Sequence, residues 1–504
     1  MLLMGIDLGT SSVKVSVLDT RQAKVLASVQ YPETERTVQS LQPGWAEQDP
    51  ETWWQDVQAA ILAAHGTRTY RASDIAAIGI TYQMHGLVMT DMNGAVIRPA
   101  IIWCDSRAVA IGAKAAEAMG AGFCLSHYLN LPGNFTASKL RWVQQHEPQH
   151  YSRLHQWMLP GDFIAQRLTG ECTTTSSALS EGICWDFKTH TVADALLQHY
   201  QLDKAHIPCL QPLFGIHGRV TAGIAARLQL TKGIPVTYKA GDQPNNALAL
   251  NVVQPGEVAA NAGTSGVLYA VNDRADYDPL SRVNAFAHVT HETSKPAIGT
   301  LLCINGAGIM YRRTKELLGG ALSYQAMNEA SATIEPGANG LQVLPFGNGA
   351  ERMLNNRHTG AAWLGVDLNR HLPAHFFRAA QEGIAFAFRY GMDIMRSNGF
   401  EPKVIRAGYA NLFRSNVFTD ILSQVLNSPI ELYETDGSVG AARGAGIGAG
   451  IYQTMSEAFD GLPSIGSQQP RAAAVEQYEA LYADWKHQLI TALQSAETAN
   501  TDHP

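Results

Sequence analysis

Two short segments share a pattern that is suited to binding phosphate. Residues 7–17 read DLGTSSVKVSV and residues 261–271 read NAGTSGVLYAV, so a Gly-Thr-Ser turn follows an apolar strand in both. Glycine lets the backbone approach a phosphate closely, and the hydroxyl and N–H groups of the turn can bind its oxygens. One such turn is also common in ordinary hairpins, but two that face each other across a cleft would hold a polyphosphate from both sides. The residues concerned are Gly9, Thr10, Ser11, Gly263, Thr264 and Ser265.

Asp7 is a candidate metal ligand. It precedes the first turn, whereas Asn261 occupies the matching position before the second. A carboxylate beside a phosphate is unfavourable unless a cation lies between them, so Asp7 is expected to bind Mg²⁺ directly or through water. The alternative is that Asp7 only caps its turn.

Asp242 is a candidate general base. It follows an expected strand at 236–239 and precedes an apolar helix start, near the middle of the chain. A carboxylate at the carboxyl end of a strand, beside a cleft, could accept a proton from a substrate hydroxyl. The alternative is that Asp242 is the N-cap of the helix, and the two roles are compatible.

A second group of polar residues ends another expected strand, at 75–80. Gln83, Met84 and His85 lie in the sequence TYQMHG, where polar groups adjoin an apolar surface and could contact a small ligand. A lone histidine is also often a structural residue. Farther along the chain, Asp105 and Arg107 in WCDSR are expected either to form a salt bridge or to bind hydroxyl groups.

The elements that must position these residues alternate between strands and helices. Asp49, Pro50 and Glu51 predict a helix start, and that helix is expected to end near Gly66. The second half predicts helices at about 373–398 and 415–426, strands at 404–407 and 429–433, and a final helix with an apolar face from Val475 to Leu493. This alternation indicates an α/β protein with helices covering mixed sheets.

The repeated turns divide the chain into two similar halves, because the second copy begins almost half a chain after the first. We expect an N-terminal domain at 1–250, a C-terminal domain at 251–496 and a polar tail at 497–504. The segment 462–470 is expected to be a connecting loop. The glycine-rich run 444–450 is expected to be a helix packed closely on a sheet or a nucleotide, and the absence of a GxxxxGK[ST] sequence excludes a P-loop.

The composition of the 504 residues is that of a globular protein, with 46% hydrophobic and 16% charged residues. A net charge of −7 argues against a nucleic-acid partner. The six cysteines are scattered without a CxxC pair, which indicates reduced thiols. With no signal-like N-terminus and no long apolar run, we expect a cytoplasmic protein without a membrane partner.

The chain resembles the FGGY carbohydrate kinases over nearly its whole length. The resemblance implies an α/β fold of two actin-like, ribonuclease-H-like ATPase domains with a cleft between them. The segments that carry it are GIDLGTSSVKV (5–15), GWAEQDPETWW (44–54), YQMHG (82–86), PAIIWCDSRA (99–108), TASKLRWVQQHEP (136–148), LPGDFIAQRLTGE (159–171), AGDQ (240–243), NAGTSGV (261–267), GAER (349–352), EGIAFAFRYGMD (382–393) and DGSVGAARGAGIGAG (436–450).

The resemblance also implies roles for individual residues. Asp242 matches the catalytic base and Asp7 the acid near the metal. The substrate contacts it implies are Gln83, Met84, His85, Asp105 and Gln243. The nucleotide contacts it implies are the residues of both turns together with Gly306, Gly408 and Asn411. The segment AGYANLF at 407–413 departs from the glycine-rich adenosine loop of the family, which leaves the nucleotide preference open.

The activity implied is the phosphorylation of a ketopentose, D-xylulose to D-xylulose 5-phosphate, with ATP and Mg²⁺, by a homodimer. The alternatives within the same class are kinases of ribulose, fuculose, gluconate or glycerol. Outside that class, the alternatives are a non-enzymatic actin-like ATPase and a sugar-sensing protein that has lost its kinase activity.

Overall fold

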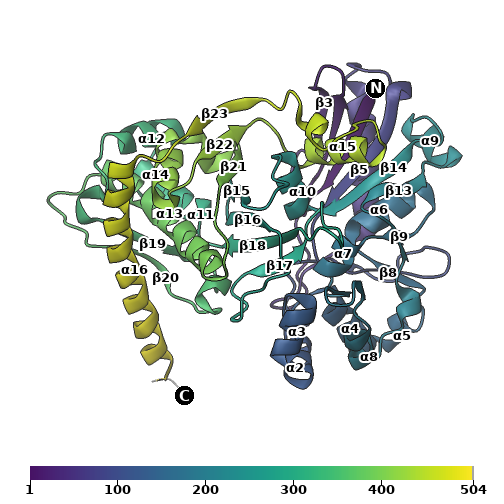
Figure 1. The fold of residues 1–504 in the computed structure, drawn as a ribbon, viewed down its shortest axis with the longest axis horizontal. Coiled ribbons are helices and arrows are strands. Elements are labelled where there is room, and N and C mark those ends of the chain that lie inside the picture. Colours follow the sequence, from purple (N-terminus) through teal and green to yellow (C-terminus); the bar gives the residue numbers. More distant parts are fainter. Residues whose placement is uncertain (502–504) are drawn as a thin grey trace.

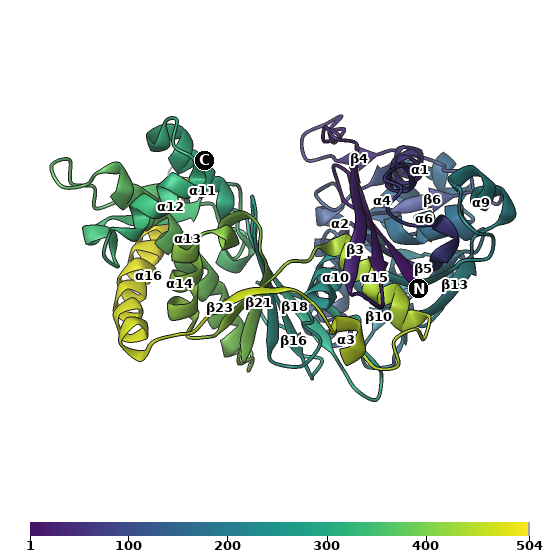
Figure 2. The ribbon, with the colours of Figure 1, turned by 90° about the horizontal axis from the view of Figure 1, so that it is seen from above.

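A computed structural model describes the backbone of residues 1–501 and the side chains of residues 1–495. The chain forms two lobes that meet along strands of the second sheet (Figures 1 and 2). The expected tail begins within a helix that continues to Thr501, and residues 502–504 lie outside the described residues.

The first lobe is built on a six-stranded sheet. Leu2–Leu8 and Val13–Asp19 form the predicted hairpin, and the first of these strands also pairs in parallel with Ile75–Tyr82. Most side chains of these strands are buried, which explains why the sequence shows apolar runs here. In spatial order the sheet contains β13 (Phe214–Arg219), β14 (Pro235–Gly241), β5 (Ile75–Tyr82), β1 (Leu2–Leu8), β2 (Val13–Asp19) and β3 (Lys24–Tyr31).

The second lobe repeats this arrangement on a seven-stranded sheet. The second hairpin is antiparallel, and its first strand again pairs in parallel with a later strand. The internal repeat predicted from the two Gly-Thr-Ser turns therefore corresponds to two sheets with the same local topology. In spatial order the sheet contains β17 (Asn284–Ala287), β18 (Ile298–Ile304), β16 (Gly266–Asn272), β15 (Glu257–Ala262), β21 (Val404–Gly408), β22 (Ile430–Tyr433) and β23 (Ser464–Gln468).

The strand β23 corrects the expectation of a loop at 462–470. It pairs antiparallel with β22 at the edge of the second sheet. Its sequence, SIGSQ, carries no apolar alternation, and its side chains are mostly exposed. An edge strand held mainly by backbone hydrogen bonds gives little signal in a sequence.

Helices cover the sheets, and the helix start predicted at Asp49 is confirmed: its carboxylate accepts a hydrogen bond from the N–H of Glu51 at 2.9 Å. The helices of the first half are α1 (Pro50–Gly66), α2 (Val109–Met119), α3 (Ala121–Tyr128), α4 (Thr136–His146), α5 (Pro148–Tyr151), α6 (Pro160–Thr169), α7 (Ser176–Glu181), α8 (Asp194–Tyr200), α9 (Ala222–Leu228) and α10 (Asp242–Ala249). Those of the second half are α11 (Gly308–Thr314), α12 (Tyr324–Ala332), α13 (Pro373–Ser397), α14 (Asn416–Leu426), α15 (Gly437–Gly448) and α16 (Ala472–Thr501).

Short strand pairs complete the fold. They are β4 (Glu47–Gln48) with β7 (Ala100–Ile101), β6 (Val88–Thr90) with β8 (Gln156–Met158), β9 (Thr173–Thr174) with β12 (Cys209–Leu210), β10 (Trp185–Asp186) with β11 (Thr191–Val192), and β19 (Gln342–Phe346) with β20 (Gly360–Leu364). The last helix packs through its apolar face as expected, since Trp485 is fully buried and donates to the carbonyl of Val343 at 2.7 Å. Among the described residues, none of the helices has the length and apolar character needed to span a bilayer.

The glycine-rich helix α15 packs on the first sheet, although it belongs to the second half of the sequence (Figures 1 and 2). The strands beneath it carry glycine where the helix backbone comes closest: a Cβ atom on Gly5 would overlap the carbonyl of Ser438, and one on Gly79 that of Ala441. The close helix–sheet packing predicted for the glycine-rich run is therefore present. A helix of the expected C-terminal domain, 251–496, thus packs on the sheet of the expected N-terminal domain, 1–250. A local sequence pattern does not indicate which sheet a small-residue helix covers.

Candidate active site

The two hairpin turns lie in different surroundings. In the first turn the N–H of Gly9 donates to the carbonyl of Ser12 at 3.0 Å, and the carbonyl of Ser11 accepts from the N–H of Arg36 at 2.8 Å. The hydroxyl of Thr10 accepts from Nε1 of Trp103 at 3.0 Å. Two backbone hydrogen bonds and the side chain of Trp103 thus hold this turn in place.

Gln48 joins the first turn to Gln83. Its Nε2 donates to the carbonyl of Thr10 at 2.6 Å, and its Oε1 accepts from Nε2 of Gln83 at 2.9 Å. The hydroxyl of Thr10 also lies 3.5 Å from Oε1 of Gln83. The structure therefore brings a predicted phosphate contact and a predicted substrate contact together, through a residue that the sequence did not single out.

The second turn is fixed to the start of α11. The carbonyl of Gly263 accepts from the N–H of Gly308 at 2.9 Å, and that of Thr264 accepts from Ile309 at 3.1 Å. Thr264 and Ser265 are exposed, so their hydroxyl groups are accessible to a ligand. A Cβ atom on Gly263 would lie 3.4 Å from Nδ2 of Asn411, which places this turn beside the loop that follows β21.

A pocket of about 200 Å³ lies between the two halves of the chain. Gly408 and Asn411, both predicted nucleotide contacts, line it together with Gln243 of α10. The remaining lining residues are Asn246, Ala249, Leu250, Ala259, Ala260, Asn261, Val267, Tyr269, Ala410, Thr435, Asp436 and Gly437. The pocket therefore unites the helix that begins at Asp242, the second hairpin and the start of α15.

Gly306 lies in a packed turn. A Cβ atom there would overlap the carbonyl oxygen of Pro345, so only glycine fits. The neighbouring N–H of Asn305 donates to both carboxylate oxygens of Glu351, at 2.9 and 3.1 Å. Burial raises the pKa of Glu351 to about 7. Glu351 therefore holds the turn that contains Gly306, a role that the GAER motif alone did not indicate.

Asp7 is a buried carboxylate that feels the negative charges of Asp242 and Asp436. Burial, followed by the charges of Asp242 and Asp436, raises the pKa of Asp7 to about 7. Lys14 opposes this effect and lies 2.5 Å from Asp436. A Cβ atom on Gly437, at the start of α15, would overlap Oδ2 of Asp7. The carboxylates around Asp7 therefore make the site negatively charged, and the charge of Lys14 offsets this in part.

Asp242 is the first residue of α10, and the N-cap is Gly241, so the alternative role of Asp242 as N-cap is wrong. Its Oδ2 accepts from Nε2 of Gln243 at 3.2 Å. Burial raises the pKa of Asp242 to about 6, although hydrogen bonds from Gln243 lower it in part. A carboxylate with this pKa is ionised at neutral pH and is a stronger base than an exposed aspartate.

His85 has a left-handed backbone conformation, with φ of 61°, at the end of the segment that follows β5. Its Nδ1 lies 2.9 Å from the carbonyl of Glu181, and its own carbonyl accepts from Nζ of Lys139 at 2.9 Å. Burial, followed by the charge of Lys139, lowers the pKa of His85 to about 3. The imidazole is therefore neutral. Because a carbonyl only accepts, Nδ1 carries the proton and Nε2 is left as an acceptor.

Met84 packs against the strand end that precedes Asp242. It is buried, and a Cβ atom on Gly241 would lie 2.6 Å from its Cγ. Met84 therefore lies against Gly241, the residue that directly precedes Asp242.

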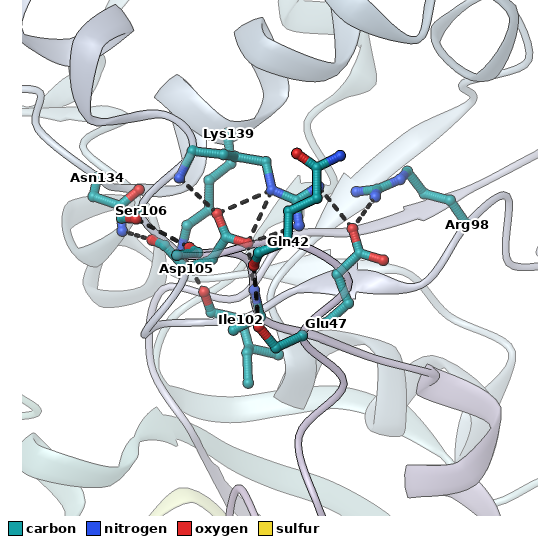
Figure 3. Close-up of polar contacts among 12 residues, drawn as sticks. Gln42, Glu47, Arg98, Ile102, Asp105, Ser106, Asn134 and Lys139 are labelled. Carbon is teal, nitrogen blue, oxygen red and sulfur yellow. Dashed lines mark hydrogen bonds and ion pairs between the residues drawn. The ribbon is translucent and has the colours of Figure 1, made fainter.

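Asp105 forms the salt bridge that the sequence allowed. The side chain is fully buried, its Oδ2 accepts from the N–H of Ala46 at 2.6 Å, and both oxygens bind Arg107 (Figure 3). Arg107 also lies 2.7 Å from Glu47, which in turn pairs with Arg98 at 2.5 Å. The structure thus places Asp105 in a buried ionic network, with its carboxylate oxygens already bonded.

The surroundings of Asp7 suit a divalent cation that binds both this carboxylate and the phosphates of a nucleotide. Among the described side chains, no cluster of three or more histidine, cysteine or acidic residues is arranged to hold a metal by itself. Mg²⁺ usually keeps several waters and binds one or two carboxylates together with substrate phosphates. Asp7, buried and with excess negative charge around it, would be such a ligand.

Models of a known protein family match most of this chain. The FGGY family of carbohydrate kinases matches through its N-terminal domain at residues 2–249 and its C-terminal domain at residues 258–450. A xylulose kinase of Escherichia coli strain K12 is 30% identical over 487 residues, which cover 94% of this chain and 96% of the relative.

Solved structures show the same fold. The crystal structure of xylulose kinase from Rhodospirillum rubrum has a TM-score of 0.87 at 26% identity, and the match covers 99% of this chain and 100% of that one. A gluconate kinase from Lactobacillus acidophilus also has a TM-score of 0.87, with 99% of each chain covered, but its 21% identity shows the fold alone.

The chain belongs to the FGGY family of carbohydrate kinases. It is therefore an enzyme that transfers a phosphoryl group to a sugar. Its two sheet-containing lobes are the two actin-like ATPase domains of that family, which confirms the fold class predicted from the sequence.

Proposed function

We propose that this enzyme phosphorylates a ketopentose with ATP and Mg²⁺, and that its substrate is D-xylulose, converted to D-xylulose 5-phosphate. The observation that carries the proposal is the position of Asp242. This carboxylate follows Gly241, against which Met84 packs, and its charge helps to raise the pKa of Asp7. The xylulose kinases among the relatives at about 30% identity support a ketopentose in particular.

Asp242 acts as the general base in this proposal. As the terminal oxygen of the sugar forms its bond to the γ-phosphorus, the hydroxyl proton passes to Asp242. The bond between the γ-phosphorus and the bridging oxygen breaks, and ADP leaves. A positioned base of this kind contributes about 10²–10⁴-fold to the rate.

His85 orients the sugar. Its Nε2 is an acceptor because Nδ1 donates to the carbonyl of Glu181. A sugar hydroxyl can donate to this nitrogen at any working pH, since the pKa of His85 is about 3 and the ring stays neutral. The adjacent Met84 supplies an apolar surface for the carbon chain of the sugar.

The two turns hold the nucleotide phosphates. The second turn, Gly263–Ser265, lies beside Asn411 and the pocket, and exposes the hydroxyl groups of Thr264 and Ser265. Asp7 would hold Mg²⁺, which supplies positive charge to the transferring phosphoryl group. Backbone N–H groups of both turns would stabilise charge on the same group.

ADP release measured over a panel of sugars tests the proposal. The purified enzyme is given ATP, Mg²⁺ and one of D-xylulose, D-ribulose, L-fuculose, gluconate or glycerol. D-xylulose is expected to give the highest kcat/KM, with far slower ADP release when no sugar is added. A higher kcat/KM for another sugar or polyol would reassign the substrate within the class. Equal ADP release with and without every sugar would contradict sugar phosphorylation.

A further inference from the structure

Glu181 is a buried acid that the mechanism above does not use. It is the last residue of α7 and is 2% exposed. Its Oε1 accepts from the hydroxyl of Tyr82 at 2.7 Å. Its Oε2 is buried and has no hydrogen-bond partner among the described residues. Such a carboxyl group is costly to bury unless it is neutral or has a function.

Glu181 contacts both parts of the reaction centre. A Cβ atom on Gly241, the residue before Asp242, would lie 3.1 Å from Oε2 of Glu181. The same oxygen lies 3.9 Å from Nδ1 of His85. The backbone carbonyl of Glu181 accepts from that Nδ1 at 2.9 Å. Glu181 therefore lies next to the end of β14, which directly precedes Asp242, and next to the imidazole ring of His85.

We propose that Glu181 is a positioning residue for the phosphoryl transfer: its side chain, fixed by Tyr82, supports Gly241 and so places Asp242, while its carbonyl sets the tautomer of His85. This proposal rests on the function proposed above, in which Asp242 is the base and His85 binds the sugar. It adds a residue that never touches the substrate but acts on both groups that do.

The chemistry of the surroundings favours a neutral Glu181. Burial raises its pKa well above the usual value, and the negative charges of Asp242 and Asp162 add to this. In the neutral form it supports Gly241 without repelling the carboxylate of Asp242. An ionised Glu181 would place a second negative charge beside the base. The titratable groups that face it are Tyr82 of β5, His85, Asp162 of α6, Asp242 of α10 and Tyr269 of β16.

Three variants of the full-length enzyme test the proposal, with an exposed acid as control. Glu181→Ala removes the support of Gly241 and the acceptor for Tyr82. Glu181→Gln keeps both without the ability to ionise, and Tyr82→Phe removes the hydroxyl that fixes Glu181. Glu171→Gln, on the exposed segment between α6 and β9, is the control for loss of a carboxylate. Circular dichroism and melting temperature confirm that each variant is folded.

Glu181→Ala is expected to lower kcat by about 10–100-fold and to raise the KM for the sugar, because a base displaced by a fraction of an ångström loses alignment. The KM for ATP should stay unchanged, which a general structural defect would not allow. Glu181→Gln should recover kcat to within about threefold, because the amide keeps the contact with Gly241 and an acceptor for Tyr82 and carries no charge, like a neutral carboxyl group. Tyr82→Phe should fall between these two.

Two results would overturn the proposal. One is a folded Glu181→Ala enzyme whose kcat lies within about threefold of the wild type, in the range of the control. The other is equal loss in Glu181→Ala and Glu181→Gln, which would mean that the charge of Glu181 is required. Failure of the proposed function is separate: it would appear as an Asp242→Asn enzyme that retains turnover, whatever the Glu181 variants do.

Discussion

Nζ of Lys14 lies 2.5 Å from Oδ2 of Asp436, so an ion pair joins the first hairpin to the residue that caps α15. Asp436 also accepts from the N–H of Val439 at 3.1 Å and from the hydroxyl of Ser438 at 2.6 Å. Although burial alone would raise it, Lys14 and these hydrogen bonds hold the pKa of Asp436 below its usual value. The two halves of the sequence are thus tied together beside Asp7.

Asp436→Ala is predicted to lower the free energy of unfolding by about 1–2 kcal/mol, mainly through the lost helix cap, with a smaller part from an ion pair that is about one-third exposed. Asp436→Ser keeps an oxygen that can cap the helix and should recover about half of the loss. Urea denaturation followed by fluorescence measures both. Equal stability of the alanine and serine variants would show that the cap contributes nothing.

Asp242→Asn is predicted to lower kcat for the sugar by about 10²–10⁴-fold, because the amide cannot accept the hydroxyl proton. The KM for ATP should change little. Initial rates of ADP release at saturating sugar measure the effect, and Asp203→Asn, at an exposed acid that does not line the pocket, is a suitable control. Near-normal turnover of folded Asp242→Asn would remove Asp242 from the role of base.

The same substitution is predicted to stabilise the protein above about pH 6. Burial raises the pKa of Asp242 from 3.8 to about 6, so the folded state resists ionisation that the unfolded state undergoes freely. The favourable contribution of the protonated carboxyl is therefore present below pH 3.8 and is lost as the pH rises to about 6. Asp242→Asn should gain about 3 kcal/mol at pH 8 and almost nothing at pH 3.5. Melting temperatures across this range test the sign, and a variant that is less stable at pH 8 would contradict it.

Gly79→Ala is predicted to destabilise the protein by about 1–3 kcal/mol, because its Cβ would overlap the backbone carbonyl of Ala441 and push α15 from the first sheet. Gly66→Ala is a matched control, since a Cβ there has open space around it. Thermal unfolding of the two variants should separate them clearly. A stable Gly79→Ala protein would show that α15 can shift without cost.

The local patterns in the sequence predicted much of this structure. The two hairpins, the helix start at Asp49 and the placement of Asp242 at a strand end all follow from neighbouring residues, through turn chemistry, capping and strand patterning. These signals depend on interactions within a few residues, and a single sequence displays them directly.

What the sequence did not reveal depends on contacts between distant segments. Glu181 carries no periodic or motif signal, and its burial comes from the packing of α7 against β14 and β17. Asp105 has the same side chain as Asp242, yet Arg107 and Ala46 occupy its oxygens. The residues that pack around an acid in the folded protein determine whether its carboxylate is free to bind a ligand or is held in a salt bridge, and the local sequence does not show them.

Because of the path of the chain through α15, no single break in the chain divides it into two fragments that each contain one complete lobe. After β22 the chain leaves the second sheet, covers the first with α15, and returns to form β23. Leu3, Leu18 and Ala77 on the first sheet are buried in a cluster completed by Ala442 and Ala445 of that helix. A fragment that ends near residue 250 would lack α15, so this face of the first sheet would be exposed to water. The helix that covers the N-terminal lobe therefore comes from the C-terminal part of the sequence.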